Sequence, residues 1–464
     1  MQLVKLHCMV QRRRQSLRLV AMLLPCLGLN WFSMLTSHVA AAPPGFVTRS
    51  GTKFMLDGKP FYVGGTSTHY LGWGTRKEVD AVLEDARKMN FNVVRSILHS
   101  VIGAPDGSKP HIWNFASTSD SSNMGMHGVY VLYWNPTTNS WAWNDSTVNG
   151  LGRWDYVIYK AKSLGLKLNI SLIDFWRWAG GTQQINAWYG TQYPNAANNN
   201  AQNYYDFYTD ARMKQLYKDW VNHVLNRVNS ITGVRYKDDP TIFAWDLMNE
   251  PEFAWDRLGY GRDWLMEMSA YVKSIDRNHL LSAGSESRMK PDGTRINGFD
   301  PEAVLSLPNI DFGTWHTYPA YHDELASPAA VVDLIKQHGQ IAARQKKPVI
   351  IQEFGYSFKK PDRAAVYKSW TDAVYNNSNS AGWIVWRIEG RVVTPPTRNF
   401  PEAENDPLGD YPPDNGESFS FFNNDSATSR VLAQAAAKIT ARNKQQVLKK
   451  RATPSTNKTK GPKA

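Results

Sequence analysis

The chain has 464 residues, of which 42% are hydrophobic and 20% charged, so it is long enough for one large globular domain or two ordinary ones. Its formal net charge is +12, but the excess lies at the two ends: residues 1–42 carry five basic side chains, residues 444–464 carry seven, and neither segment carries an acid. A nucleic-acid-binding domain has its basic excess on the fold itself, so the formally neutral body predicts no nucleic-acid partner.

The first 42 residues have the order of a secretory signal. A basic segment ends at Arg18, a broken apolar stretch covers residues 19–35, and small residues follow at 39–42. An uncleaved membrane anchor is the alternative, although the stretch is short and interrupted beside the roughly 20 residues that a membrane-spanning helix needs. We therefore expect a secreted, extracellular protein whose folded domain covers residues 43–443.

The cysteines and histidines exclude several chemistries. Cys8 and Cys26, the only two cysteines, fall in the expected signal, so the rest of the chain holds no cysteine nucleophile, zinc–thiolate site or redox motif. His316 and His322 lie six residues apart, and neither a His-Glu-x-x-His pattern nor a Gly-x-Ser-x-Gly elbow is present. We expect no metal, no cofactor and no obligate protein partner.

Short apolar segments recur along the chain and predict eight β-strands, at residues 61–68, 91–98, 166–174, 242–250, 279–286, 311–319, 348–357 and 381–388. Helical patterns alternate with them, at 78–90, 154–165, 211–231, 263–276, 329–345, 363–377 and 429–444. Alternating strands and helices form parallel sheets, and eight repeats predict an α/β fold of the closed (β/α)8 TIM-barrel type. An open doubly wound sheet is the alternative, but "GGTSTHYLGWG" after the first strand fits its Gly-rich phosphate loop poorly.

Long segments follow the second and eighth strands. Residues 99–149 are rich in Gly, Ser, Asn and Trp, and residues 389–425 in Pro, Asn and Asp. Both leave the carboxyl ends of strands, where barrel enzymes build their sites, so they predict cleft walls. The basic residues 444–464 predict a disordered tail.

Polar and aromatic side chains occupy the expected carboxyl ends of the strands, which form a ring in a barrel. In chain order they are Ser67, His69, Tyr70, Arg95, His99, Asp174, Trp176, Asn249, Glu250, Glu286, His316, Tyr318, Glu353 and Trp386. An isolated glutamate at a strand end is usually a solvated charge, but two carboxylates that face each other across a pocket suit glycoside hydrolysis. The 18 tryptophans indicate either exposed faces for stacking sugars or simply a large core.

The two carboxylates need different environments. The acid must stay protonated near the working pH, so its surroundings must raise its pKa, whereas the nucleophile must stay ionised, which a nearby arginine favours. Arg95 is the candidate for that arginine, and His316 and Tyr318 are candidates for hydrogen bonds to the carboxylates or the sugar. Asn249 is placed to bond a sugar hydroxyl, and Trp386 to stack on a pyranose.

"LMNEP" at residues 247–251 and "IIQEFG" at 350–355 resemble glycoside hydrolase family 5, a retaining (β/α)8 family. "FVTRSGTKFMLDGKPFYVGGTSTHYL", "VNHVLNRVNSITGVRYKDDPTIFAWDLMNEP", "VKSIDRNHLLSAGSE" and "IDFGTWHTYP" look like the endo-β-1,4-mannanases of plant and fungal type within it. The resemblance runs from residue 46 to about residue 443 and is strongest over 216–357.

The resemblance implies roles for matching positions. Glu250 is the expected acid/base and Glu353 the expected nucleophile, supported by Arg95 and Asn249. The remaining candidates for binding or support are His316, Tyr318, Trp176, Glu286 and Trp386, the last as the platform beneath the cleaved sugar.

The sequence also departs from the mannanase pattern. Glu252 and Phe253 follow Asn-Glu-Pro where the mannanases usually have Arg, a residue associated with binding the leaving group. The second strand ends in Arg95-Ser96-Ile97-Leu98-His99 rather than Arg-Thr-Trp-Ala-Phe, and Asp174-Phe175-Trp176 replaces Asn-Asn-Trp. The conserved chemistry with an altered rim predicts a retaining glycosidase for internal β-1,4-mannosidic bonds in mannan, glucomannan or galactomannan. The alternatives are a β-1,4-glucanase, an exo-β-mannosidase or a barrel that only binds glycan.

Overall fold

The computed structural model describes residues 43–105, 128–176, 180–189, 204–253, 258–296, 299–319, 327–390, 419–424 and 426–451. All of them belong to one compact unit of the chain. The expected signal at residues 1–42 and parts of both long loops lie outside the described residues. Among the helices of the described ranges, none is both long and apolar enough to cross a membrane.

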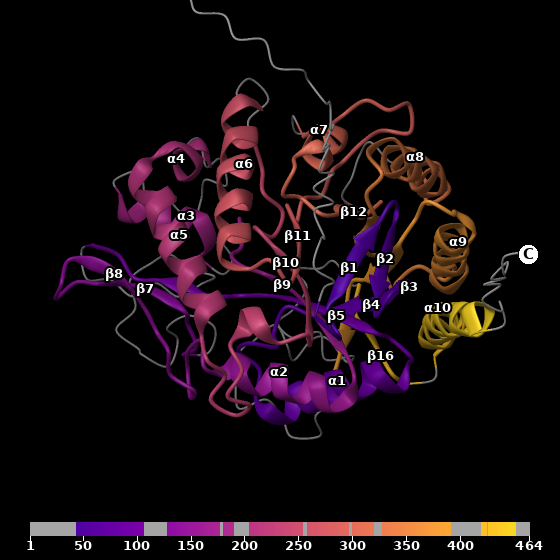
Figure 1. Ribbon diagram of the computed structural model, residues 1–464, viewed down its shortest axis with the longest axis horizontal. Coiled ribbons are helices and arrows are strands. Elements are labelled where there is room, and N and C mark those ends of the chain that lie inside the picture. The colour runs from indigo at the N-terminus through magenta and orange to yellow at the C-terminus, as the bar shows by residue number, and fades with distance from the viewer. Residues whose placement is uncertain are drawn as a thin grey trace, which may run out of the picture. The chain divides into compact units, whose positions relative to one another are not determined.

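Eight parallel strands form the central sheet (Figure 1). They are β4 (Val63–Ser67), β5 (Val93–Ile97), β9 (Lys167–Ser171), β10 (Ile242–Asp246), β11 (Leu280–Ser282), β12 (Gly313–Thr317), β13 (Val349–Phe354) and β14 (Gly382–Val385). Each lies within a segment that the sequence predicts as a strand. Their side chains are almost all buried, as expected for strands covered on both faces.

The strand order is that of a barrel. It runs β11-β10-β9-β5-β4-β14-β13-β12, so that β4, the first barrel strand, pairs with both β5 and the last strand, β14. Main-chain hydrogen bonds link the two ends of this order: Asp311 N donates to Leu281 O at 2.8 Å, and His316 N donates to Glu286 O at 2.9 Å. The predicted barrel is confirmed, and the doubly wound alternative is wrong.

Helices surround these strands (Figure 1). They are α1 (Arg76–Lys88), α2 (Arg153–Leu164), α3 (Gly181–Trp188), α4 (Tyr204–Thr209), α5 (Ala211–Asn226), α6 (Leu258–Ile275), α7 (Pro301–Ser306), α8 (Ala330–Gln345), α9 (Arg363–Asn376) and α10 (Ala427–Arg451). The seven predicted helical patterns correspond to α1, α2, α5, α6, α8, α9 and α10, whereas α3, α4 and α7 were not predicted. These three span only six to eight residues, too few for a hydrophobic period to show.

Smaller sheets lie outside the barrel. An amino-terminal meander of β1 (Val47–Ser50), β2 (Lys53–Leu56) and β3 (Lys59–Phe61) carries Phe54, which packs against Phe243 and Phe312 at ring-centroid distances of 5.0 and 5.4 Å. The loop after strand two contains β6 (Val101–Ile102), β7 (Leu132–Asn135) and β8 (Ser140–Trp143), and the loop after strand eight contributes β15 (Ile388–Glu389) and β16 (Phe421–Phe422). Residues 106–127 and 391–418 of these loops lie outside the described residues.

One expectation needs correction, and one open alternative is decided. Helix α10 continues to Arg451, so the beginning of the expected disordered tail is helical, as its Lys, Gln and Arg residues, all good helix formers, allow. The tryptophans serve mainly the core: nine described ones are buried, namely Trp73, Trp154, Trp188, Trp220, Trp245, Trp264, Trp315, Trp370 and Trp383.

Candidate active site

Glu250 lies just beyond β10 at the carboxyl end of the barrel. Its main-chain N–H donates to Gly284 O at 2.8 Å, so the neighbouring strand holds the turn in place. Its φ is +47°, in the left-handed region, which costs a non-glycine residue about 1–3 kcal/mol. The strand thus ends in a strained turn that fixes the direction of the Glu250 side chain.

The Glu250 carboxylate contacts a tryptophan and a histidine. Its Oε2 accepts from Trp176 Nε1 at 2.7 Å, and its Oε1 lies 2.5 Å from His316 Nδ1. The side chain is 14% exposed, whereas His316 is fully buried. The carboxyl group is therefore held in one orientation and remains accessible to a substrate.

Glu353 lies on β13, next to His316 on β12. Arg95 Nη1 donates to its Oε1 and the Tyr318 hydroxyl to its Oε2, and the side chain is only 5% exposed. Both oxygens of the candidate nucleophile are thus held in place by hydrogen bonds, one from an arginine and one from a phenol.

The two carboxyl groups are close together. An oxygen of Glu250, an oxygen of Glu353 and a nitrogen of His316 all lie within 4.8 Å of one another. Retaining glycosidases separate their carboxyl groups by about 5–5.5 Å and inverting ones by about 6.5–9.5 Å, so the geometry is that of a retaining enzyme. A metal at these atoms would have to compete with the Arg95 guanidinium and the Tyr318 hydroxyl, which already donate to Glu353.

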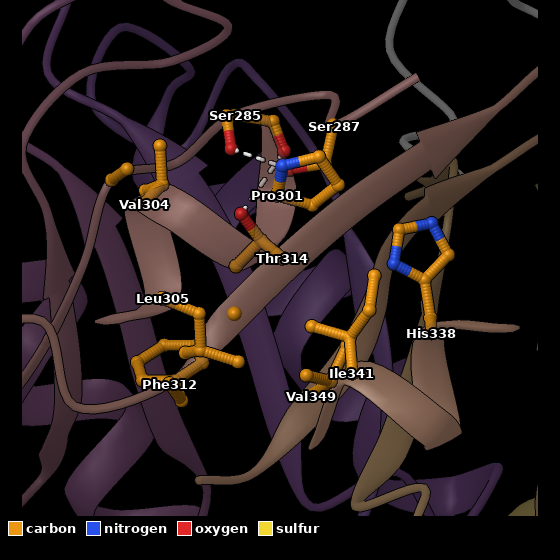
Figure 2. Close-up of a pocket in the computed structure, with 12 residues that line it drawn as sticks. Ser285, Ser287, Pro301, Val304, Leu305, Phe312, Thr314, His338, Ile341 and Val349 are labelled. Atoms are coloured by element: carbon orange, nitrogen blue, oxygen red, sulfur yellow. Dashed lines mark hydrogen bonds between the residues drawn. The ribbon is translucent and has the colours of Figure 1, made fainter. Parts of the chain in front are cut away.

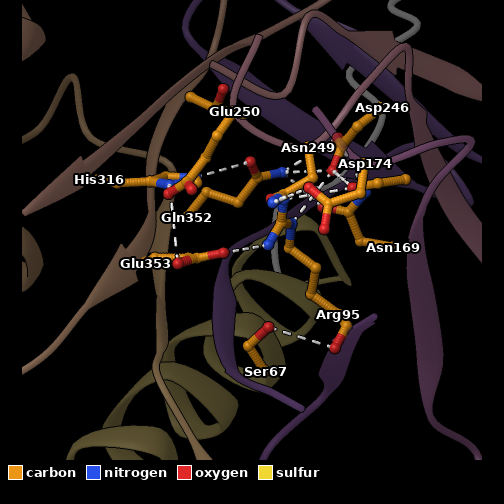
Figure 3. A network of polar contacts seen from close by, with 12 residues as sticks. Ser67, Arg95, Asn169, Asp174, Asp246, Asn249, Glu250, His316, Gln352 and Glu353 are labelled. Carbon is orange, nitrogen blue, oxygen red and sulfur yellow. Dashed lines mark hydrogen bonds and ion pairs between the residues drawn. The ribbon is translucent and has the colours of Figure 1, made fainter. Parts of the chain in front are cut away.

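Arg95 is the centre of the buried polar layer below the carboxylates (Figure 3). Besides Glu353, its guanidinium donates to Asp246 at 3.1 Å, to Asn249 at 2.7 Å and to Ser171 at 3.2 Å. With its side chain fully buried and these four acceptors engaged, the arginine cannot rotate without breaking several bonds, which fixes the position of the nucleophile.

Asp246 is the buried acceptor that balances Arg95. It also accepts from Ser171 at 2.9 Å, Ser282 at 2.6 Å and the amide of Gln352 at 3.0 Å. Burial raises the pKa of Asp246, but the charge of Arg95 and the hydrogen bonds from its neighbours lower it more, and the net shift is downward. Asp246 therefore stays ionised and anchors the layer.

A side branch of the network extends toward β9. Asn249 Nδ2 donates to Asp174 Oδ1 at 2.9 Å, and Asp174 Oδ2 lies 3.1 Å from His99 Nε2. Asn249 accepts from Arg95 with its oxygen, so its second amide hydrogen is the one that can serve a sugar hydroxyl. His99 and Asp174, two departures from the mannanase pattern, thus form one connected unit.

The surroundings of Glu250 and His316 shift the pKa values of both groups. Burial, followed by the negative charges of Glu286 and Glu353, raises the pKa of Glu250 to about 7, against the opposing effect of His316. Burial lowers the pKa of His316, but the charges of Glu353 and Glu250 raise it more, so its net shift is upward. Glu250 can therefore carry the proton that a general acid donates at neutral pH.

Glu286 lies near enough to Glu250 for its charge to affect that carboxyl group. It lines a small pocket together with Pro251, Glu252, Arg288, Phe299 and other residues. Its charge acts on the pKa of Glu250. The departure at Glu252 is therefore located on the acid side of the site, next to where a leaving group is protonated.

Trp386 lies at the end of the eighth barrel strand and is partly exposed. The ring of His69 stacks on it, with centroids 5.7 Å apart and planes inclined by 26°. His69 from the first barrel strand and Trp386 from the last are thus adjacent, as barrel closure requires. Whether a sugar stacks on Trp386 stays a prediction.

A separate small cavity lies between α7, α8 and β12 (Figure 2). Leu305, Thr314 and His338 are among its lining residues. Burial lowers the pKa of His338 to about 3, and its ring stacks on Trp315 at 4.4 Å. This neutral, stacked histidine is part of the packing, and none of the ring residues at the strand ends lines the cavity.

The sequence did not single out Asp246, Gln352, Asn169 or Ser171. All four are fully buried polar residues in otherwise apolar strands. Asn169 and Ser171 are two residues apart and so share one face of β9. Polar residues at inward positions of buried strands were the signal that could have found this layer.

A closed (β/α)8 barrel that holds two close carboxylates at its carboxyl end, one bound by an arginine and one with a raised pKa, defines a glycoside hydrolase of the retaining class. The family model described as "GH family 5 beta-mannosidase-like" matches residues 44–444. The chain belongs to this family.

Sequence comparison with individual proteins agrees with this family. The chain is 30% identical over 396 residues to mannan endo-1,4-beta-mannosidase 3 of Arabidopsis thaliana, covering 80% of this chain and 86% of that protein. It is 31% identical over 399 residues to mannan endo-1,4-beta-mannosidase 1 of Oryza sativa subsp. japonica, covering 80% and 84%.

Solved structures give the same result. The endo-1,4-β-mannanase of Rhizomucor miehei superposes with a TM-score of 0.69 at 31% identity, over 85% of this chain and 99% of that one. The endo-β-1,4-mannanase of Thermotoga petrophila gives a TM-score of 0.65 at 30% identity, over 83% and 78%. The resemblance inferred from the sequence is confirmed at the level of family and fold.

Proposed function

We propose that this protein is a retaining endo-β-1,4-mannanase that hydrolyses internal linkages of mannan, glucomannan or galactomannan. The observation that carries the proposal is the close pair Glu250 and Glu353, in which one group is set to hold a proton and the other is bound by an arginine. The names of the relatives support mannan as the substrate.

The chemistry takes two steps. Glu353 attacks the anomeric carbon while the bond to the leaving sugar breaks, and Glu250 gives its proton to the leaving oxygen. In the second step water attacks the same carbon, its proton passes to Glu250, and Glu353 is released as a carboxylate. Arg95 and Tyr318 hold the nucleophile throughout, since both donate to its oxygens.

Substrate assays of wild type and Glu353→Ala test the proposal. The wild-type protein should hydrolyse locust-bean gum and leave carboxymethylcellulose intact, and the variant should lose at least about 10⁴-fold in kcat, since removing a nucleophile leaves little chemistry. Glu302→Ala, on the outer surface of α7 where it pairs with Arg344, is the control. Equal activity of wild type and Glu353→Ala would overturn the catalytic assignment, and activity on cellulose alone would favour the glucanase alternative.

Product analysis separates the endo from the exo mode. With mannohexaose, an endo enzyme releases mannobiose, mannotriose and mannotetraose from the start. Release of mannose alone, in linear proportion to time, would instead identify an exo-β-mannosidase of the same family.

We also propose that the protein is secreted after cleavage near Pro43. The support is the order of basic, apolar and small residues over 1–42. The mass of the protein recovered from the medium of a eukaryotic expression host should match a chain that begins at Ala42 or Pro43, and a full-length, cell-bound protein would favour the anchor instead.

A further inference from the structure

Gln352 precedes the nucleophile on β13 and is fully buried. The pairing of β12 with β13 shifts here: Trp315 pairs with Ile351, but His316 pairs with Glu353, so Gln352 is an extra residue in β13. Bulges of this kind occur next to active sites and redirect side chains. The bulge lets two consecutive residues, Gln352 and Glu353, both reach the polar interior.

The side-chain amide of Gln352 can lie only one way round. Its nitrogen is 3.0 Å from each carboxylate oxygen of Asp246 and 2.9 Å from Asn169 Oδ1. The amide nitrogen of Asn169 is itself used on Asp246 Oδ1 and Ala244 O, so Asn169 presents its oxygen. Because both neighbours offer only acceptors, the Gln352 nitrogen must face them and its oxygen must face the other side.

On that other side lies His316. The Gln352 oxygen is 3.3 Å from His316 Nε2, a long hydrogen bond with an acceptor that carries no proton. Nε2 of His316 must therefore be the protonated nitrogen, and in a neutral imidazole Nδ1 then carries no hydrogen. Nδ1 is the atom 2.5 Å from Glu250 Oε1, so one proton is shared between the histidine and the acid/base.

We infer that Gln352 is a positioning residue for acid/base catalysis: held by Asp246 and Asn169, it fixes the tautomer of His316 and thereby keeps the shared proton at Glu250. The inference rests on the proposed function for its kinetic consequences. Before the first step the proton sits between Glu250 and His316. After Glu250 has given it to the leaving oxygen, a bare Nδ1 faces the carboxylate and favours recovery of a proton from water in the second step.

Arg95 determines which groups donate and which accept in the hydrogen bonds that lead from it to Glu250. This arginine can only donate, and Asp246 accepts from it and from Gln352. Gln352 in turn accepts from His316 through its side-chain oxygen. His316 then accepts from Glu250 through Nδ1 (Figure 3). The charged groups that act on His316 are Glu250 from the turn after β10, Glu353 from β13 and Arg95 from β5. One buried arginine thus holds the nucleophile by direct contact and keeps the acid protonated through three intermediates.

The tautomer can be measured directly. Nitrogen chemical shifts of histidine-labelled wild-type protein distinguish a protonated from a bare ring nitrogen, and the His316→Asn variant assigns the signal. At a pH where His316 is neutral, Nε2 should appear protonated and Nδ1 bare or sharing a proton. A neutral His316 protonated on Nδ1 would overturn the inference, and this readout requires neither activity nor any variant of Gln352.

The kinetic test uses Gln352→Met, which keeps the volume but offers no amide, and two substrates. Without Gln352 the His316 ring can place its proton on Nδ1 and donate to the Glu250 carboxylate, so kcat/KM for mannohexaose should fall about 10–100-fold, part of the 10²–10⁴-fold that acid catalysis supplies. The alkaline limb of its pH profile should move to lower pH. With 2,4-dinitrophenyl β-mannobioside, whose leaving group needs no proton, kcat/KM should stay near the wild-type value.

Thr314→Val, on the same strand as His316, is the matched control, since it removes a buried hydrogen bond of 3.0 Å to Ser285 O but leaves the contact between Gln352 and His316. It should keep the wild-type ratio of the two activities. An equal loss on both substrates in Gln352→Met, or a changed ratio in Thr314→Val, would show a purely structural role. Wild-type inactivity on every β-mannoside would instead contradict the proposed function while the tautomer measurement still decides the inference.

Discussion

At the scale of single residues, the strained turn at Glu250 shows how the barrel adapts a strand end to chemistry. The left-handed φ of Glu250 is retained because Gly284 O accepts its N–H, and Trp176 and His316 then hold its carboxylate. The carboxyl group so placed is surrounded by other negative charges. Its protonation, and with it the activity, must therefore depend on pH.

The alkaline limb of the pH profile should report the proton of Glu250. Because its pKa is raised to about 7, the acid is protonated below that pH, and kcat/KM for mannohexaose should fall as the pH rises through it. Glu286→Gln removes one of the charges that raise this pKa, so the limb should move to lower pH, by an amount measured from the profile. Glu302→Gln, a neutralised carboxylate on α7, should leave the limb in place, and an unmoved limb in Glu286→Gln would contradict the electrostatic assignment.

At the scale of secondary-structure elements, a buried carboxylate ties α2 to the segment after α5. Both oxygens of Asp155 accept from Arg227, at 3.0 and 2.8 Å, and Tyr236 and Ser230 donate to them as well. Asp155 is fully buried, and its pKa is lowered because these donors outweigh the effect of burial. Its stabilising contribution is present above the ordinary aspartate pKa and is lost only as the pH falls through the lowered value.

Removing this carboxylate should loosen the helices without changing the chemistry. Asp155→Ala leaves the buried Tyr236 hydroxyl without its acceptor and the partly buried Arg227 with Asp145 alone, so the free energy of unfolding should fall by about 1–3 kcal/mol, measured by urea titration. The kcat/KM of the folded fraction should stay at the wild-type value. Asp333→Ala, which removes an exposed pair with Lys336, is the control and should change stability by less than about 1 kcal/mol.

Elements differ in how well the sequence could predict them. Long helices with a clear period, such as α1 with Val79, Val82, Leu83 and Ala86 buried on one face, follow from pattern alone. The strand ends follow as well, because barrel closure gathers them. The inward position of Gln352 could not be derived, since a bulge of one residue decides which side chain of β13 faces inward and no periodicity predicts a bulge.

At the scale of the whole molecule, the carboxyl-terminal helix completes the ring of helices around the barrel. Asn443 on α10 accepts from Tyr62 N at 2.9 Å and donates to Tyr62 O at 3.1 Å, and the Arg442 guanidinium lies 4.0 Å from the centroid of the Tyr62 ring. Tyr62 directly precedes β4, so the last helix is fastened to the start of the first barrel strand.

A truncation and a point substitution should distinguish the contribution of residues 452–464 from that of Asn443 in α10. A chain ending at Arg451 should keep the wild-type thermal midpoint and kcat/KM on soluble mannan. Asn443→Ala should lower the free energy of unfolding by about 1–3 kcal/mol, because it leaves a buried main-chain group at Tyr62 without a partner. An unchanged thermal midpoint in Asn443→Ala, or a marked drop on removal of 452–464, would contradict this division.

The stereochemistry of hydrolysis tests the central claim most directly, because it depends on the distance between Glu250 and Glu353. Proton NMR of mannohexaose during the first minutes of hydrolysis distinguishes the anomers of the new reducing ends. With carboxylate oxygens within 4.8 Å, there is no room for a water between nucleophile and sugar, so the β-anomer should appear first and the α-anomer only later by mutarotation. Initial release of the α-anomer would contradict the account.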